Sequence, residues 1–353
     1  MHNDATPNAR VPRSNDDARR ATLQPMTADR WPHDALLAPE ARAIPKCRDA
    51  HPFTLRFLNA VAASIAHRNL THQLQVYGVM PTSCDLDRLT LLLQTTRATG
   101  SARTPTPRWL IFFVNDDYGG PIPLKQHQHV LIRTSLNPPF DDLNVHAMPY
   151  LPYDIPFPPH FVPKPRGERE DLPVVGFCGV SWMSPGRKSL IQAISAAEKE
   201  NHTMRTLFVM RNTYFGGPES EFNQNMNESH FIVASRGVGN FAMRLYQTMA
   251  AGRIPVLTRP INTMRLPLEN VIPWRECLVQ APSDTAVVRR MLQIWNTGTE
   301  VERRQRRCAA MFREWFDLEE PGGAGYVEEL VAQLGANTSA GGSIYKRAFN
   351  RTI

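Results

Sequence analysis

The sequence predicts an α/β fold in which the C-terminal half forms a doubly wound parallel sheet. Between residues 173 and 295, apolar runs of strand length alternate with amphipathic runs of helix length, which is typical of parallel strands joined by right-handed crossovers. A continuous apolar run at residues 109–114 is typical of a strand buried on both faces. A proline-rich stretch at residues 138–165 separates the two regions and predicts a linker without regular structure.

The N-terminal region is predicted to begin with a helix, because residues 52–68 carry apolar side chains at helical spacing. Further patterns predict, in chain order, a strand at 74–79, a helix at 85–96, and strands at 109–114 and 129–133. The chain therefore divides into four parts, namely a disordered tail at 1–45, an α/β domain at 46–160, a second α/β domain at 161–300, and C-terminal helices with a loose tail at 301–353. Residues 335–353 are either a partner segment or merely a loose tail.

The C-terminal region alternates more regularly than the N-terminal one. Strands are predicted at 173–178, 205–210, 231–235, 254–257 and 276–279, and helices at 187–199, 220–229, 240–251, 285–295 and 300–316. In parallel sheets of this kind, ligands bind outside the carboxyl ends of the strands. Three loops are expected to converge there, at residues 179–182, 211–214 and 235–237.

Residues 235–256 are the most informative stretch, because they predict a strand, a glycine-rich turn, a helix and another strand. Asn240 is the expected N-cap of this helix, and Gly237 belongs to the turn before it. A helix N-terminus attracts anions through its N–H groups and dipole, and Arg236 and Arg244 add positive charge. The sequence therefore predicts a ligand that carries phosphates.

The same stretch resembles the exostosin-like glycosyltransferases, family 47 of the glycosyltransferases. The similarity covers residues 236–256, extends to 266–274 and 221–229, and is weaker over the rest of roughly 105–280. It implies two Rossmann-like domains that face a cleft, as in the GT-B arrangement. It also implies that residues 161–300 hold a nucleoside diphosphate sugar and that residues 46–160 hold the acceptor.

Two residues depart from the family's usual pattern. Gln247 replaces a Glu and Ala242 replaces a Ser. The resemblance assigns position 247 to the ribose hydroxyls of the donor, where Gln still offers an acceptor oxygen but loses the charge-assisted part of the hydrogen bond. The alternative is that Gln247 is a surface position on an amphipathic helix.

Further residues are candidates for donor binding. Arg187 opens the helix after the 179–182 loop and either reaches the diphosphate or belongs to an ordinary basic pair with Lys188. Arg244 matches a family arginine, and its alternative role is an internal salt bridge. Glu269 matches an acidic position of the family, where it either touches the sugar or caps the next element.

Sugar transfer with inversion needs a base that deprotonates the acceptor hydroxyl. Asp116 and Asp117 are the candidates, because they follow the buried 109–114 strand; their alternative role is turn formation before Gly119. His127 and His129 are further alternatives. No metal-binding pattern accompanies them, so basic side chains are expected to neutralise the leaving diphosphate without a metal.

Composition narrows the remaining possibilities. The chain has 353 residues and a net charge of +7, and it contains neither an apolar run of membrane-spanning length nor the short apolar core of a secretory signal. We therefore expect a cytoplasmic protein. The basic run at 302–307 favours a solvated helix surface over a nucleic-acid site, while peripheral contact with an acidic membrane surface stays open.

The cysteines form no metal or disulfide pattern and are expected to be free thiols; they are Cys47, Cys84, Cys178, Cys277 and Cys308.

Two functions follow from these observations. The first is an inverting glycosyltransferase that uses a nucleoside diphosphate sugar and a glycan, lipid-linked or small hydroxyl acceptor. The second is a degenerate transferase that acts as a sugar-binding, nucleotide-binding or interaction module, in which Gln247 marks the loss of donor recognition.

Overall fold

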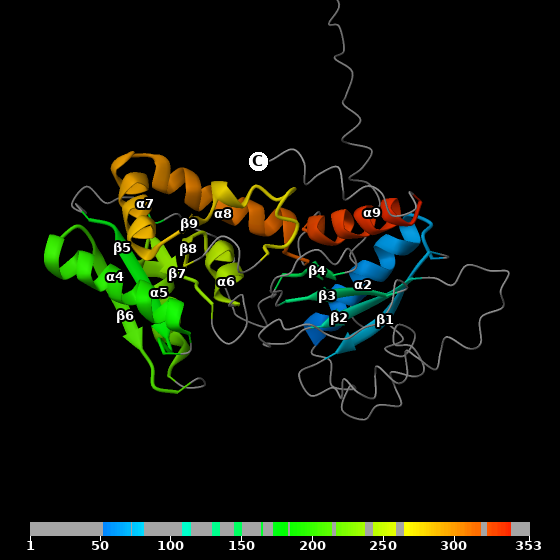
Figure 1. Ribbon diagram of the computed structural model, residues 1–353, viewed down its shortest axis with the longest axis horizontal. Coiled ribbons are helices and arrows are strands. Elements are labelled where there is room, and N and C mark those ends of the chain that lie inside the picture. The colour runs from blue at the N-terminus through cyan, green and yellow to red at the C-terminus, as the bar shows by residue number, and fades with distance from the viewer. Residues whose placement is uncertain are drawn as a thin grey trace, which may run out of the picture. The chain divides into compact units, whose positions relative to one another are not determined.

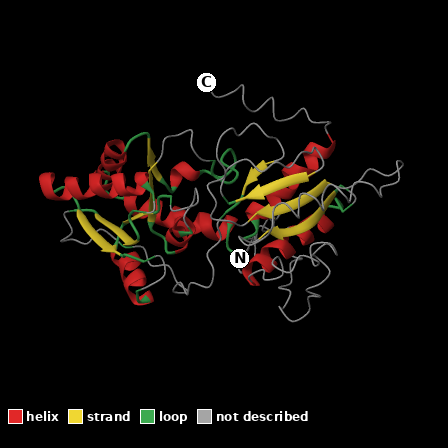
Figure 2. Ribbon diagram, turned by 60° about the horizontal axis from the view of Figure 1, so that its bottom comes forward, coloured by secondary structure: helices red, strands yellow, loops and turns green. Residues whose placement is uncertain are grey.

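The computed structural model describes residues 52–71, 73–80, 108–113, 129–134, 145–149, 164, 172–182, 184–213, 217–236, 243–258, 265–318 and 323–339. These residues form two parallel β-sheets, each with helices packed against it (Figures 1 and 2). The predicted α/β class with Rossmann-like parallel sheets is confirmed. The boundary at residue 160 stays a prediction.

The first sheet has four parallel strands in the order β1-β2-β3-β4. They are β1 (Leu74–Met80), β2 (Arg108–Phe113), β3 (His129–Arg133) and β4 (Val145–Ala147). Helix α2 (Pro52–His67) packs against β1 and buries Phe57, Leu58, Val61 and Ile65. The predicted helix at 52–68 and the three predicted strands of this region are confirmed. The helix expected at 85–96 lies outside the described residues.

Strand β4 corrects one prediction, since the whole of 138–165 was expected to lack regular structure. Val145–Ala147 pairs in parallel with Leu131–Arg133 of β3. The prolines of this stretch lie at positions 138 and 139 and again from 149 onwards, so the residues between them keep their backbone donors. A short gap between prolines is therefore enough for an edge strand.

Helix α9 (Gly325–Ser339) completes the packing around α2. The Tyr326 ring stacks on Phe57 with 6.1 Å between centroids, and its hydroxyl donates a hydrogen bond to the Ala147 carbonyl (2.9 Å). The segment from 335 onwards was interpreted as either a partner segment or a loose tail. Its first residues instead form the last turn of α9, in which Gly335 lies against Leu70.

The second sheet has five parallel strands in the order β6-β5-β7-β8-β9. They are β5 (Val174–Gly179), β6 (Arg205–Met210), β7 (Phe231–Val233), β8 (Ile254–Thr258) and β9 (Val279–Ala281). The accompanying helices are α4 (Pro185–Asn201), α5 (Glu219–Glu228), α6 (Arg244–Ala250), α7 (Asp284–Asn296) and α8 (Glu300–Trp315).

Helices cover both faces of this sheet, so the doubly wound prediction is confirmed. Val175 of β5 shares a buried cluster with residues of α4 and α7. The next residue, Gly176, faces the opposite side of the sheet. A Cβ added there would collide with Asn225 of α5 and with Ser229, which follows α5. Because β6 lies on one side of β5 and β7 on the other, the strand order reverses between β5 and β7.

The strand predicted at 276–279 begins later than expected. Trp274–Glu276 forms a 3-10 turn (η4), and the strand itself is Val279–Ala281. The backbone N–H groups of Cys277 and Leu278 both donate to the Trp274 carbonyl, which keeps these two apolar residues in the turn.

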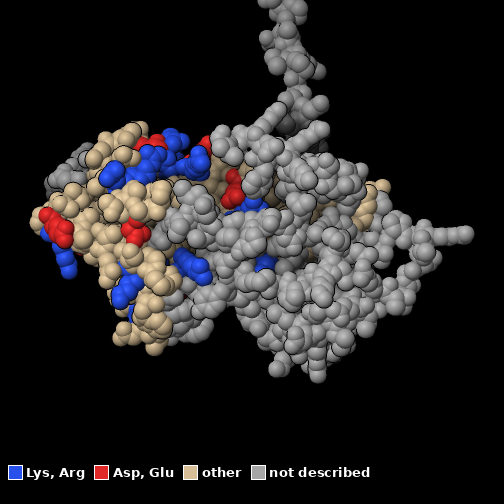
Figure 3. Space-filling model, viewed as in Figure 1, with Lys and Arg blue, Asp and Glu red and all other residues tan. Residues whose placement is uncertain are grey.

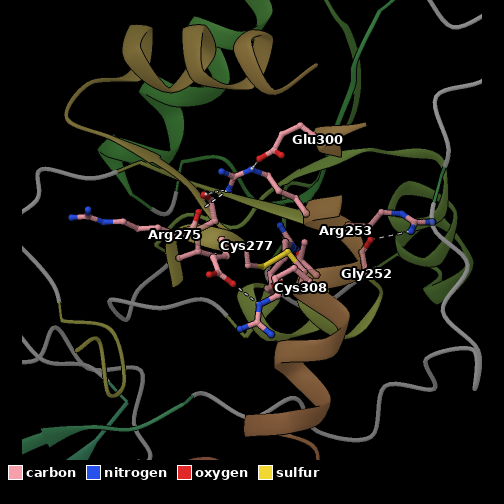
Figure 4. Close-up of a disulfide and its surroundings, with 12 residues drawn as sticks. Gly252, Arg253, Arg275, Cys277, Glu300 and Cys308 are labelled. Carbon is pink, nitrogen blue, oxygen red and sulfur yellow. Dashed lines mark hydrogen bonds and ion pairs between the residues drawn. A yellow bond between two sulfur atoms is a disulfide. The ribbon is translucent and has the colours of Figure 1, made fainter. Parts of the chain in front are cut away.

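A disulfide joins Cys277 to Cys308 of α8, so the expectation that all cysteines are free thiols is wrong for this pair (Figure 4). The two residues are 31 positions apart, but α8 packs over η4 and brings their Cα atoms to 4.9 Å. Around the bond, Arg304 donates to the Arg275 carbonyl (2.8 Å) and Arg307 pairs with Glu276 (2.6 Å). Cys178 is a buried free thiol as expected; Cys47 and Cys84 lie outside the described residues.

The basic run at 302–307 lies on α8 as predicted. Arg303 and Arg306 are exposed and pair with Glu300 and Glu302 on the same helix. Figure 3 shows basic side chains over α7 and α8 with acidic ones beside them. Arg304 differs from the prediction, because it is buried and bonded to Glu300 and to backbone carbonyls.

Among the described helices, none combines the length and apolarity needed to cross a bilayer.

Candidate functional site

The candidate site lies where β5, β6 and β7 end, which we call the carboxyl edge of the second sheet. Loops that leave neighbouring strands in opposite directions at a reversal of strand order open a crevice, and ligands of doubly wound sheets bind there. The loop after β5 runs through Val180 to Ser184, and the segment after β7 begins with Ala234 and Ser235. These are two of the three loops that the sequence predicted to converge.

Arg187 connects the two loops. Its Nη1 donates to the Val180 carbonyl (2.9 Å) and its Nη2 to the Ser235 carbonyl (2.8 Å). Its own backbone N–H is capped by the Ser184 hydroxyl (3.2 Å). The side chain is buried and its guanidinium lies 5.7 Å from the centroid of the Phe177 ring. Arg187 therefore sets the spacing of the two loops, while the predicted contact with a diphosphate stays a prediction.

Arg244 lies at the same edge, on the first turn of α6. Its guanidinium carbon is 5.0 Å from the centroid of the Phe177 ring and 5.7 Å from that of Phe222 in α5. Gly179 lies beside it with a φ of +149°, and a Cβ there would be 3.1 Å from Arg244 Nη2. The positive φ favours glycine at this position, and a side chain there would push the Arg244 guanidinium away by a few tenths of an ångström. The two aromatic rings hold a cation against the last residue of β5.

Arg211 brings a third guanidinium to the carboxyl edge. It directly follows β6, and its backbone N–H donates to the Gly179 carbonyl (2.9 Å). Its side chain donates to the Pro218 carbonyl (3.1 Å) and pairs with Glu221 (3.3 Å). Arg211 begins the third of the loops that were predicted to meet at this edge. No sequence motif marked it as a candidate site residue.

The thiol of Cys178 reports the electrostatics of this edge. Burial raises the pKa of Cys178, and the positive charges of Arg211 and Arg244 act in the opposite direction. Arg236 follows Ser235 and is half-buried, so it adds a fourth basic residue to the carboxyl edge. The negative charge of Glu221 opposes only part of this, so the edge is positively charged overall.

Gln247 is buried, with 6% of its surface exposed, so the alternative that it is a surface residue is wrong. The helix that carries it is anchored from the far side, where Tyr246 packs edge-on against Phe316 and Trp274, with centroids 5.1 and 6.5 Å away. The role of position 247 in binding ribose stays a prediction.

Several candidates lie outside the described residues. They are Gly237, Asn240, Asp116 and Asp117, together with Ala242 and His127. The described part of the helix predicted at 240–251 begins at Arg244, and Met243 before it has helical dihedral angles. His129 is the first residue of β3. The proposed anion site at the helix N-terminus and the proposed catalytic base are therefore still predictions.

Glu269 caps a turn. Its carboxylate pairs with Arg265 (3.2 Å) and accepts a hydrogen bond from the Leu266 backbone N–H (3.4 Å). Nearby, the Trp274 indole N–H donates to the Pro267 carbonyl (2.9 Å), which fixes the same loop. Both partners precede Glu269 in the chain, so these bonds close the 265–269 turn. Capping of the next element and contact with a sugar both stay predictions.

Arg253 belongs to the stretch that resembles the family but lies at the opposite end of the sheet, directly before β8. It is buried and donates to four backbone carbonyls, those of Met226, Asn227, Ala251 and Gly252. Figure 4 shows Arg253 beside Gly252. Burial lowers the pKa of Arg253 to about 10, so the guanidinium is still charged at neutral pH. It satisfies carbonyls at the C-terminal ends of α5 and α6.

Comparisons with known proteins find similarity in architecture only. No family model matches the chain, and no curated protein matches it. Among solved structures, TarM aligns with a TM-score of 0.41 and 10% identity over 79% of this chain, which spans 58% of the length of TarM. HepE of Anabaena in complex with UDP aligns with a TM-score of 0.40 and 13% identity, covering 78% of this chain and 82% of HepE. WaaG, a glycosyltransferase involved in lipopolysaccharide biosynthesis, aligns with a TM-score of 0.38 and 11% identity, covering 79% and 95%. At these TM-scores and identities the likeness carries no argument about function. The exostosin resemblance still rests on residues 221–229, 236–256 and 266–274.

Proposed function

We propose that the protein is a glycosyltransferase that uses a nucleoside diphosphate sugar as donor. The observation that carries this proposal is the convergence of Arg187, Arg211 and Arg244 around Phe177 and Gly179, at the reversal of strand order between β5 and β7. Crevices at such a reversal bind nucleotides in other doubly wound proteins.

The chemistry of the donor fits this charge distribution. When the sugar leaves its donor, negative charge builds up on the diphosphate, and guanidinium groups held in fixed positions stabilise it. Arg244 is held against two aromatic rings and next to a glycine backbone, so a diphosphate could approach without a side chain intervening at position 179. We therefore also propose that the reaction needs no metal.

The finer details of the proposal come from the resemblance to the exostosin family. It assigns Arg236, Gly237, Asn240 and Gln247 to the donor, and it favours inversion with Asp116 or Asp117 as the base. The acceptor is a glycan, a lipid-linked saccharide or a small hydroxyl compound.

A degenerate transferase that only binds nucleotide sugars is the second candidate. The observation that favours it is Gln247, where the family's usual residue is Glu. Such a protein would keep the arginines of the carboxyl edge and bind the donor without cleaving it.

Thermal stability in the presence of UDP-, GDP-, ADP- and dTDP-sugars tests the proposal. A ligand at 100 times its Kd stabilises the folded state by about 2.7 kcal/mol, which is a shift of several degrees. The shift should disappear in Arg244→Ala and persist in Arg306→Ala, an exposed arginine on α8. Hydrolysis of the donor that binds would favour a transferase, and binding without hydrolysis or transfer would favour the degenerate module. A chain that binds none of these nucleotides would contradict both.

A further inference from the structure

The most exposed large apolar side chains of the described residues gather at the carboxyl edge. Trp182, in the loop after β5, is 63% exposed, and Met210, the last residue of β6, is 48% exposed. Met210 is the register partner of Gly179, the last residue of β5, and Trp182 follows that glycine by three positions in the chain. Val271 is the next most exposed at 37% and lies elsewhere.

Isolated exposed hydrophobic residues are ordinary on protein surfaces. Trp182 differs because of the loop that carries it. On one side, Val180 is buried and its carbonyl accepts from Arg187 Nη1 (2.9 Å). On the other side, Ser184 is buried and caps α4. Both ends of a very short loop are therefore fixed, and the indole at its centre is presented to solvent.

An exposed indole on a short loop whose two ends are held is suited to stacking on a ring. Tryptophan offers a large flat face with few rotatable bonds, so ordering it costs little conformational entropy. The basic side chains of Arg211 and Arg244 lie at the same edge and would attract an anion. A ligand that joins a ring to a diphosphate matches both features, and nucleoside diphosphate sugars have this chemistry in their base and in their sugar.

We propose that Trp182 is a binding residue that stacks on a ring of the bound nucleotide sugar and thereby contributes to specificity. This inference rests on the proposed function. The ring is either the nucleobase or the transferred sugar, and the two are distinguished by the effect of the same substitution on nucleoside diphosphates with and without the sugar.

The experiment compares Trp182→Ala and Trp182→Phe with the unchanged chain by calorimetry, using UDP, GDP, ADP, dTDP and their glucose or mannose conjugates. Base stacking on an aromatic side chain is worth about 1–3 kcal/mol, so Trp182→Ala should weaken binding between about 5- and 150-fold. Trp182→Phe should retain most of the affinity, because it keeps an aromatic face. Both variants should melt at the temperature of the unchanged chain, since the side chain is exposed.

Equal losses with and without the sugar would support stacking on the nucleobase, and a loss confined to the sugar conjugates would support stacking on the sugar. Unchanged binding in Trp182→Ala, together with weakened binding in Arg244→Ala, would overturn the inference and leave the proposed function standing. A chain that binds none of the probes, although it is folded, would overturn the proposed function and the inference with it.

Discussion

Arg244 and Arg253 lie nine positions apart in one stretch of sequence, yet they lie at opposite ends of the second sheet. Arg244 contacts the rings of Phe177 and Phe222 at the carboxyl edge, beside a glycine that leaves room for it. Arg253 is buried before β8 and donates to carbonyls at the ends of two helices. Helix α6 separates them and reverses the direction of the chain. Membership of a motif therefore does not decide whether an arginine serves the ligand or the fold.

The largest effect should come from Arg253→Met, which removes a buried guanidinium and leaves carbonyls of α5 and α6 without their donor. The expected loss of stability is about 3–5 kcal/mol, because several buried carbonyls lose a charged donor and each acceptor left unsatisfied costs about 1–3 kcal/mol. Chemical denaturation measures it. The folded fraction should bind a nucleotide sugar with unchanged affinity, and weaker binding at equal folded fraction would place Arg253 in the site after all.

The disulfide supplies the next largest effect. Replacing both Cys277 and Cys308 by Ala opens a link across 31 positions of sequence, and the loop-entropy relation gives a loss of about 3.5 kcal/mol. Denaturation with and without reductant checks this, since the unchanged chain should lose stability in reductant and the double variant should not. Mass analysis of the unreduced chain that finds two free thiols at these positions would contradict the bond. Cys178→Ala, which removes the buried free thiol, serves as the matched control. This variant should lose stability in reductant just as the unchanged chain does.

Arg244→Ala should weaken binding of the nucleotide sugar about 10- to 150-fold, because a charge-assisted hydrogen bond to an anion contributes about 1.5–3 kcal/mol. Stability should change much less than in the Arg253 variant. Raising the salt concentration should weaken binding by the unchanged chain more than binding by the variant, since one ionic contact is gone. Arg306→Ala is the control on exposed charge.

Gln247→Glu should tighten binding severalfold if position 247 holds the ribose, because a carboxylate accepts stronger hydrogen bonds from hydroxyl groups than an amide does. Gln247→Met, which has a similar size and no acceptor, should weaken binding. Calorimetry with a nucleoside and with its 2′-deoxy form locates the contact. Affinities that do not respond to either substitution would remove position 247 from the site and favour a purely structural role for this buried side chain.

The sequence predicted most strands of both sheets and the helices beside them because apolar periodicity is local, and for β3 and β6 the bounds agree to the residue. The short strand β4 was missed, and β9 was predicted three positions too early. Contacts between segments that are distant in the chain could not be predicted from this local pattern. The pairing of Cys277 with Cys308 depends on how α8 packs over η4, and the hydrogen bonds of Arg187 to Val180 and Ser235 depend on two loops meeting. Residue type alone also could not separate Arg304, which is buried, from Arg303 and Arg306 on the same helix.

Acid titration tests the smallest of the expected effects, at Glu300. Its side chain bonds Arg303 (2.7 Å) and Arg304 (2.8 Å), and the hydrogen bond from Arg303 is the largest cause that lowers the pKa of Glu300 to about 2. Because the folded pKa lies below the ordinary value of 4.5, these bonds stabilise the protein fully above pH 4.5 and are lost as the pH falls towards 2. Glu300→Gln should therefore cost about 1 kcal/mol at pH 7, and the difference from the unchanged chain should shrink below pH 4.5. Glu302→Gln, whose partner Arg306 is 68% exposed, should cost less at neutral pH. Equal losses of stability for the two variants at neutral pH would mean that the buried positive charge of Arg304 does not depend on pairing with Glu300.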